Sequence, residues 1–206
     1  GRRSSALVLA VGECAGRSIS GALLSMVGMQ LLDDIVNKNH LRSSKKIVDT
    51  LSKEFSNALN YNQQGNVFFG MDFALCTIHW KRRQLEFVGA MRPLIYIVDG
   101  EIHIVQGNGF PIGMADIEGM GHGFTRHTIP FNKSTMFYLL TDGFEDQLGG
   151  EGHRKFRFKR LKELLLSIHD LPMETQRLRL EREFTEWKGE EVQIDDLCIL
   201  GFRLPV

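Results

Sequence analysis

The chain has 206 residues, 43% of them hydrophobic, which is the size and composition of a globular domain with a core of its own. Its 25 basic and 25 acidic side chains give a formal net charge of zero, so no nucleic-acid partner is expected. The longest apolar runs, such as residues 161–168, are much shorter than the roughly 20 residues of a membrane-spanning helix, so no membrane segment is expected.

The first part of the chain predicts a strand followed by two helices. Residues 5–13 are a short apolar run ended by Gly12, Glu13 and Gly16, which is typical of a buried strand that enters a tight loop. Apolar residues at helical spacing then predict a mostly buried helix from Ser18 or Ser20 to about Lys38. A second helix is predicted over residues 44–62, with one apolar face that a sheet or another helix must cover.

The middle of the chain changes to a period of two, which is the period of strands. Antiparallel strands are predicted over six segments: 71–81, 84–91, 95–98, 101–105, 124–131 and 135–141. Asp99-Gly100 joins two of them and is the commonest sequence for a two-residue type I′ hairpin. Residues 108–123 are rich in glycine and predict an irregular loop.

The last part returns to helix and closes with a strand. A helix is predicted over residues 158–169, and a second one follows Pro172 and ends at about Lys188, where Gly189 is a natural stop. Residues 195–204 predict the final strand. The simplest interpretation is one α+β domain, over residues 1–206, of antiparallel sheet flanked by paired helices.

Cysteine usage and the start of the chain indicate its setting. The three cysteines, Cys14, Cys76 and Cys198, lack C-x-x-C spacing, so neither a disulfide framework nor a thiolate zinc site is predicted. A reducing, cytoplasmic location fits best. The chain begins at Gly1 without an initiator methionine or a signal peptide, and we therefore expect a piece of a longer protein.

Acidic residues stand at three points where a predicted strand meets a loop: Glu13, Asp142 and the pair Asp195-Asp196. A sheet can bring such strand ends together, and carboxylates gathered in one place repel one another unless a proton or a cation compensates them. Hard oxygen ligands favour magnesium or manganese over zinc. Spacing alone leaves an alternative open, in which acids beside glycine only make turns.

Six sequence strings occur in a fixed order: V-G-E-C-A-G-R-S-I-S-G-A-L-L-S-M (11–26), M-D-F-A-L-C (71–76), F-V-G-A-x-x-P-L (87–94), F-P-I-G (110–113), Y-L-L-T-D-G-F-E-D-Q-L-G-G (138–150) and E-W-K-G-x-x-x-Q-x-D-D (186–196). Together they resemble the PPM-type metal-dependent protein phosphatases, in the bacterial branch named for the sporulation protein SpoIIE. The resemblance covers about residues 5–204. It implies an αββα sandwich, in which two antiparallel sheets pack face to face between helix pairs.

The resemblance also implies a reaction and its residues. In that family two Mn²⁺ or Mg²⁺ ions activate a water that attacks a phosphoserine or phosphothreonine. Asp142, in T-D-G, matches one metal-binding aspartate, and Asp195 matches another, while Asp196 is expected in a turn or a supporting role. Glu13 stands at the position of the aspartate that bridges both metals, and Cys14 is expected to add its backbone carbonyl.

The chain departs from the family at its first motif, where E-C-A-G-R-S replaces D-x-x-G-H-G. Glutamate keeps the charge but displaces the carboxylate by about one bond length, which exceeds the ~0.5 Å that catalytic sites tolerate. Arg17, in place of histidine, adds a permanent charge that would oppose a second metal, and it is a candidate for substrate binding. Met91 and Arg92 lie where relatives often carry His or Asn before the proline. The family's further aspartate, in a strand before the segment equivalent to Ser5, has no counterpart after Gly1, so it either lies outside this sequence or is lacking.

These features predict a protein serine/threonine phosphatase domain of a bacterial signalling pathway, at the C-terminal end of a longer protein, with impaired catalysis. The alternative is an inactive pseudophosphatase that serves as a binding or dimerisation module. A third hypothesis keeps a single metal for stability only. The expected partners are a phosphorylated protein or a regulatory partner, and a second copy of the chain.

Other polar residues have plainer interpretations beside functional ones. His122 is interpreted as a loop residue rather than a ligand, and His79 alternates within a strand without a metal-ligand partner at i+2 or i+4. The basic residues within 153–162 form either a solvated face or a docking surface for an acidic phosphoprotein. Cys14 has no neighbouring His or Asp that could activate it as a nucleophile.

Overall fold

The computed structural model describes residues 6–14, 19–59, 70–114 and 123–205 of the chain. It divides into two units, each with a sheet and helices of its own. Unit 1 consists of Gly1–Leu94 and Val105–Asn132, and unit 2 consists of Ile95–Ile104 and Lys133–Val206. The expectation that residues 1–206 form a single domain stays a prediction.

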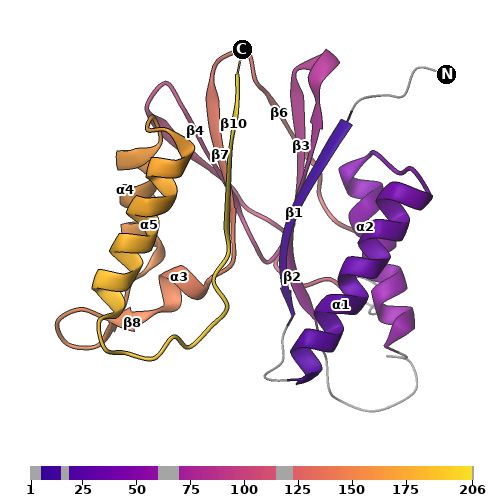
Figure 1. Ribbon diagram of the computed structural model, residues 1–206. Coiled ribbons are helices and arrows are strands. Elements are labelled where there is room, and N and C mark those ends of the chain that lie inside the picture. The colour runs from indigo at the N-terminus through magenta and orange to yellow at the C-terminus, as the bar shows by residue number, and fades with distance from the viewer. Residues whose placement is uncertain (1–5, 15–18, 60–69, 115–122, 206) are drawn as a thin grey trace. The chain divides into compact units, whose positions relative to one another are not determined.

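Unit 1 is a four-stranded antiparallel sheet with two helices on one face (Figure 1). The strand order is β1-β2-β3-β6. Its strands and helices are β1 (Ala6–Cys14), α1 (Ile19–Asp33), a π-helical turn (Asp34–Lys38), α2 (Ser44–Ala58), β2 (Met71–His79), a 3₁₀ turn (Trp80–Arg82), β3 (Gln84–Ala90) and β6 (His127–Pro130).

Helix α2 supplies much of the core of unit 1. Ile47, Leu51 and Phe55 are spaced four residues apart and are fully buried, as the predicted apolar face requires. They pack with sheet residues such as Leu75 and Val88 in one hydrophobic cluster. The sheet and α2 therefore hold the ends of β1 and β2 in a fixed register.

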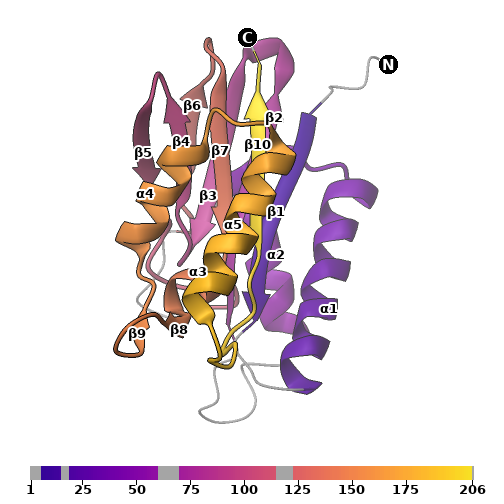
Figure 2. The same ribbon diagram turned by 60° about the vertical axis from the view of Figure 1, so that its left-hand side comes forward.

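Unit 2 is a second four-stranded sheet, in the order β10-β7-β4-β5, with α4 and α5 on one face (Figure 2). Its elements are β4 (Leu94–Val98), β5 (Glu101–Val105), β7 (Thr135–Leu140), α3 (Gly143–Asp146), the short strands β8 (Leu148–Gly149) and β9 (Arg154–Lys155), α4 (Phe158–Ile168), α5 (Met173–Lys188) and β10 (Ile199–Leu204). Leu161 and Leu165 of α4 are buried with Phe144 and Phe156.

Several predictions of local structure are confirmed. Asp99 and Gly100 both have positive φ, 52° and 77°, as a type I′ turn requires. Helix α5 follows Pro172 and ends at Lys188, directly before Gly189, which has a φ of 53°. The two sheets, each with a helix pair, confirm the predicted α+β class. Within the described residues, no helix has the length and apolar content that crossing a membrane demands.

Other predictions need correction. Helix α1 is not mostly buried, because Leu23, Met26 and Met29 are exposed while Leu24 and two glycines face the core. Helix α2 ends at Ala58. The strand predicted over residues 124–131 covers only His127–Pro130.

Two corrections concern the candidate acids. Glu13 lies inside β1 rather than after it, because its pairing with β2 extends to Cys14. The last strand begins at Ile199 instead of residue 195, so Asp195 lies four residues before it.

Candidate functional site

In unit 1, Glu13 and Asp72 form an acidic pair at the end of two neighbouring strands. The β1–β2 register places the two residues directly opposite each other. A carboxylate oxygen of Glu13 lies within 4.8 Å of one of Asp72. Both side chains are largely buried, at 16% and 23% exposed. Two like charges opposite each other in a sheet are unfavourable, so this pair needs a compensating cation.

Arg92 supplies that cation. Its Nη2 lies 2.9 Å from Glu13 Oε1 and 2.7 Å from Asp72 Oδ2. Its Nε also donates to Asp72 Oδ2, at 3.1 Å. The Arg92 side chain is only 13% exposed, and a guanidinium keeps its charge in proteins. One permanent positive charge is thus shared between the two carboxylates.

Close backbone packing positions Arg92. A Cβ at Gly89 would lie 2.2 Å from the Arg92 carbonyl oxygen and 2.9 Å from Gly107 Cα, so only glycine fits there. Met91, the residue before Arg92, has a φ of 66°, and its N–H donates to the Asn108 carbonyl at 2.8 Å. This left-handed backbone is uncommon for a non-glycine residue. The connection between β3 and β4 is therefore built around a tight turn that carries Arg92.

The Cys14 thiol is not set up as a nucleophile. Burial raises the pKa of Cys14, and the nearby carboxylates of Asp72 and Glu13 raise it further. A hydrogen bond with Ser25 lowers this pKa, but its effect is smaller than that of burial. The reactive form of cysteine is the thiolate. The raised pKa therefore agrees with the sequence interpretation, in which Cys14 does not act through its sulfur.

In unit 2, Asp142 lies next to the segment that carries Asp195 and Asp196. It follows β7 by two residues, as predicted. Thr141 fixes the adjoining segment, because its N–H donates to the Cys198 carbonyl at 3.0 Å and its hydroxyl donates to the Asp196 carbonyl at 3.0 Å. A Cβ at Gly143 would lie 2.3 Å from the Asp196 carbonyl oxygen. The T-D-G string therefore packs directly against residues 196–198.

Asp195 and Asp196 have different local roles. The Asp195 carboxylate accepts the backbone N–H of Asp196 at 2.8 Å, so Asp195 stabilises its own turn. Asp196 contacts Thr141 through its backbone. Both residues are exposed. The metal-binding role of Asp195 stays a prediction.

Unit 2 also places a cation close to its acids. Lys155 Nζ lies 2.8 Å from Asp146 Oδ2. The hydrogen bond with Asp146 raises the pKa of Lys155, and the charges of Asp146, Asp142 and Glu145 add to the effect. A positive side chain of the predicted basic segment 153–162 therefore lies in the electrostatic field of Asp142.

The sequence interpretation missed two residues of this site. Asp72 begins β2 in the M-D-F-A-L-C string, and its position opposite Glu13 could have been found by pairing the two predicted strands end to end. Arg92 was noted as a departure from the family but not as the partner of these acids. Arg17 and His122 lie outside the described residues.

The candidate acids offer ligand atoms of the right type for a hard divalent cation, because Mg²⁺ and Mn²⁺ prefer carboxylate oxygens. In unit 1, however, the charge opposite Glu13 and Asp72 already comes from Arg92. A metal at Glu13 would compete with this guanidinium for the same carboxylates.

Comparisons with known proteins place this site in context. A family model described as stage II sporulation protein E (SpoIIE) matches residues 3–205. The SiaA-PP2C domain of Pseudomonas aeruginosa is 28% identical, with a TM-score of 0.81, over 96% of this chain and 74% of that one. No curated protein sequence matches.

Two further solved structures share the fold at lower identity. The PP2C phosphatase domain of SpoIIE from Bacillus subtilis, solved with a fragment of its regulatory domain, is 13% identical, with a TM-score of 0.68, over 95% of this chain and 54% of that one. The catalytic domain of the serine threonine protein phosphatase PstP, in complex with two manganese ions, is 15% identical, with a TM-score of 0.60, over 97% of this chain and 90% of that one.

Proposed function

This chain belongs to the stage II sporulation protein E (SpoIIE) family of PP2C-like phosphatase domains. We propose that it is a metal-dependent protein serine/threonine phosphatase of a bacterial signalling pathway, with catalysis weakened at Glu13. One observation carries the proposal: the acids that match the family's metal-binding motifs lie at strand ends with further acids beside them. Glu13 lies opposite Asp72 in unit 1, and Asp142 lies beside the 196–198 segment in unit 2.

The proposed cofactor is Mn²⁺ or Mg²⁺, in line with the two manganese ions of PstP. Its proposed ligands are Glu13, the Cys14 backbone carbonyl, Asp142 and Asp195. When bound, such a cation supplies an activated water and stabilises charge on the phosphate oxygens.

The chain's own residues set the charge of this site. Arg92 partly neutralises Glu13 and Asp72, and so reduces the repulsion that an anionic phosphate would meet there.

Arg17 is proposed to bind the substrate phosphate. The proposed substrate is a phosphorylated protein, a second copy of the chain is a further proposed partner, and a cytoplasmic location is proposed.

A second candidate function is that of a pseudophosphatase that binds phosphoproteins without hydrolysing them. The observation that favours it is the double ion pair of Arg92. A guanidinium held 2.7 Å from Asp72 and 2.9 Å from Glu13 already supplies a counter-charge to the acids that a metal would need.

Hydrolysis of a phosphoserine peptide at millimolar Mn²⁺ separates the two functions. The phosphatase proposal predicts slow, EDTA-sensitive release of phosphate that Asp142→Ala abolishes. The matched control is Asp170→Ala, because Asp170 is an exposed acid remote from these motifs in sequence, and its loss should leave the rate unchanged.

The variant Glu13→Asp, Arg17→His restores the family's residues at both positions. If the altered loop weakens catalysis, this variant hydrolyses the peptide faster than the natural sequence. Phosphopeptide binding without hydrolysis in either protein would contradict the phosphatase proposal and support the pseudophosphatase.

A further inference from the structure

A second polar site lies at the other end of unit 1. Arg42, Ser43, His79, Trp80, Lys81, Arg82, Glu86 and Arg126 line a pocket of about 450 Å³. The β1–β2 register pairs His79 with Ala6 and Asp72 with Glu13, so His79 lies seven positions after Asp72 along β2. At about 3.3 Å per residue, the pocket is roughly 23 Å from the Glu13–Asp72 pair.

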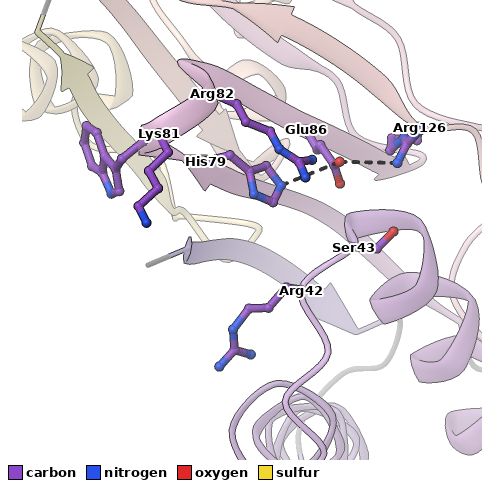
Figure 3. A pocket seen from close by; sticks show the side chains of 8 residues that line it. Arg42, Ser43, His79, Lys81, Arg82, Glu86 and Arg126 are labelled. Atoms are coloured by element: carbon purple, nitrogen blue, oxygen red, sulfur yellow. Dashed lines mark hydrogen bonds and ion pairs between the residues drawn. The ribbon is translucent and has the colours of Figure 1, made fainter. Parts of the chain in front are cut away.

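Glu86 is built into the wall of this pocket. It is 8% exposed, and its Oε2 accepts the N–H of Ser44, the first residue of α2, at 3.1 Å. Its Oε1 lies 3.3 Å from Arg126 Nη1 and 3.6 Å from His79 Nε2, as the dashed lines in Figure 3 show. Both oxygens of the one carboxylate in the pocket therefore bind protein groups already.

The pocket carries an excess of positive charge. Four basic side chains line it, those of Arg42, Lys81, Arg82 and Arg126, against the single carboxylate of Glu86. Within the described part of the chain, no carboxylate pairs with Arg42, Lys81 or Arg82. Arg42 is held by the carbonyls of Val36 and Leu41, which are neutral acceptors. Figure 3 shows the Arg82 side chain extending toward Glu86 and His79.

We infer that this pocket binds the phosphate group of a small phosphorylated molecule. Guanidinium groups present N–H donors in a planar fork that matches phosphate oxygens. The volume lies in the usual range for small-molecule sites. Trp80 also lines the pocket and is 41% exposed, so its aromatic ring is accessible to a planar group such as a nucleobase.

Two tryptophans make the test specific. The chain contains only Trp80 and Trp187, so 5-fluorotryptophan labelling gives two ¹⁹F signals, which Trp187→Phe assigns. Trp187 lies in a different basic surface, with Arg154, Lys155, Arg157, Lys159 and Arg160, and Arg160 stacks on its ring at 4.3 Å. Trp187 therefore reports on non-specific attraction of anions to a basic surface.

The full chain is titrated, without divalent cations, with inorganic phosphate, with AMP and with phosphoserine. We expect a saturable shift of the Trp80 signal and none of the Trp187 signal. Tighter binding of AMP than of phosphate would identify a nucleotide-like ligand, and tighter binding of phosphoserine would identify an amino-acid phosphate. No saturable shift at Trp80, or equal shifts at both tryptophans, overturns the inference.

Two variants change the affinity in opposite directions. Arg82→Ala removes a donor without breaking a described ion pair, and it should weaken phosphate binding about tenfold. Glu86→Gln removes the internal negative charge but keeps an acceptor for Ser44, so binding should tighten, an outcome that misfolding cannot imitate. Lys159→Ala, in the other basic surface, is the matched control. Unchanged affinity in both Arg82→Ala and Glu86→Gln contradicts the inference.

Discussion

Glu13 and Asp72 are directly opposite each other in the β1–β2 ladder, and both pair with the guanidinium of Arg92. The sheet register creates the repulsion between the two carboxylates, and the turn before β4 supplies the charge that offsets it. This arrangement gives the candidate metal site an internal cation. Its consequences for stability can be measured without any assay of activity.

Replacing Arg92 by glutamine should destabilise the fold. Arg92→Gln leaves two largely buried carboxylates opposite each other without their shared counter-charge, and the expected loss is about 2–4 kcal/mol in the free energy of unfolding. Urea denaturation at pH 7 without metal measures it. Arg182→Gln is the control, because its ion pair with Glu186 is exposed to solvent and should contribute little to stability. Equal losses in the two variants would contradict the role given to Arg92.

The same variant should bind divalent cations better than the natural chain. Without the guanidinium, Glu13 and Asp72 can share a Mn²⁺ ion, and a ligand that binds only the folded state raises the melting temperature. Millimolar Mn²⁺ should therefore stabilise Arg92→Gln by several degrees more than the natural chain. Adding Glu13→Gln to the variant should remove most of this gain. A larger Mn²⁺ effect on the natural chain would show that Arg92 does not compete with metal.

Local features of the sequence predicted the fold well. The turn at Asp99-Gly100 depends on two residues that tolerate positive φ, and α2 depends on apolar spacing within one segment. The position of Asp142 just after β7 follows from the end of an apolar run.

The Arg92 contacts could not be predicted in this way, because they depend on the register of β1 with β2 and on the path of the chain between β3 and β4. The exposure of Met26 and Met29 likewise depends on which side of α1 meets the core. The expectation that Glu13, Asp142 and Asp195 come together at one cleft stays a prediction.

Gly89 should tolerate no side chain. In Gly89→Ala the new methyl would meet the Arg92 carbonyl oxygen at 2.2 Å and Gly107 Cα at 2.9 Å, and neither backbone atom can rotate away. We expect a loss of about 3 kcal/mol or more, together with displacement of Arg92. Gly109→Ala is the matched control, since a Cβ there has nothing within 4 Å. Denaturant unfolding of both variants tests the difference, and equal stability would show that the turn can adjust.

Alkaline pH should destabilise the protein through Cys76. Complete burial raises the pKa of this thiol well above its usual range, so the folded state keeps the proton when the unfolded chain, with a thiol pKa of about 8.5, releases it. The unfolded state then binds fewer protons, and the free energy of unfolding falls as pH rises. The expected slope from Cys76 approaches about 1.4 kcal/mol per pH unit between roughly pH 9 and 10. Cys76→Ala should show a shallower slope in urea titrations at pH 7.5, 8.5 and 9.5, and identical slopes would exclude this contribution.

Gln176 should act together with Tyr138 in holding the start of α5 against β7. The Tyr138 hydroxyl donates to Gln176 Oε1 at 2.7 Å, and Gln176 Nε2 donates to the Leu171 carbonyl at 2.9 Å and the His169 carbonyl at 3.1 Å. Gln176 is 2% exposed and Tyr138 is 1% exposed. Gln176→Met keeps the volume but removes the partners of buried polar groups, and it should cost about 2–3 kcal/mol.

A double-mutant cycle checks the coupling between these two residues. Tyr138→Phe removes the hydroxyl alone and should cost about 1 kcal/mol. Because Gln176→Met already removes the acceptor of that hydroxyl, adding Tyr138→Phe to it should cost nothing further, or should restore some stability by removing a buried hydroxyl that has lost its partner. Additive losses in the double variant would show that the two side chains stabilise unit 2 independently, and that the hydrogen bond between them contributes little.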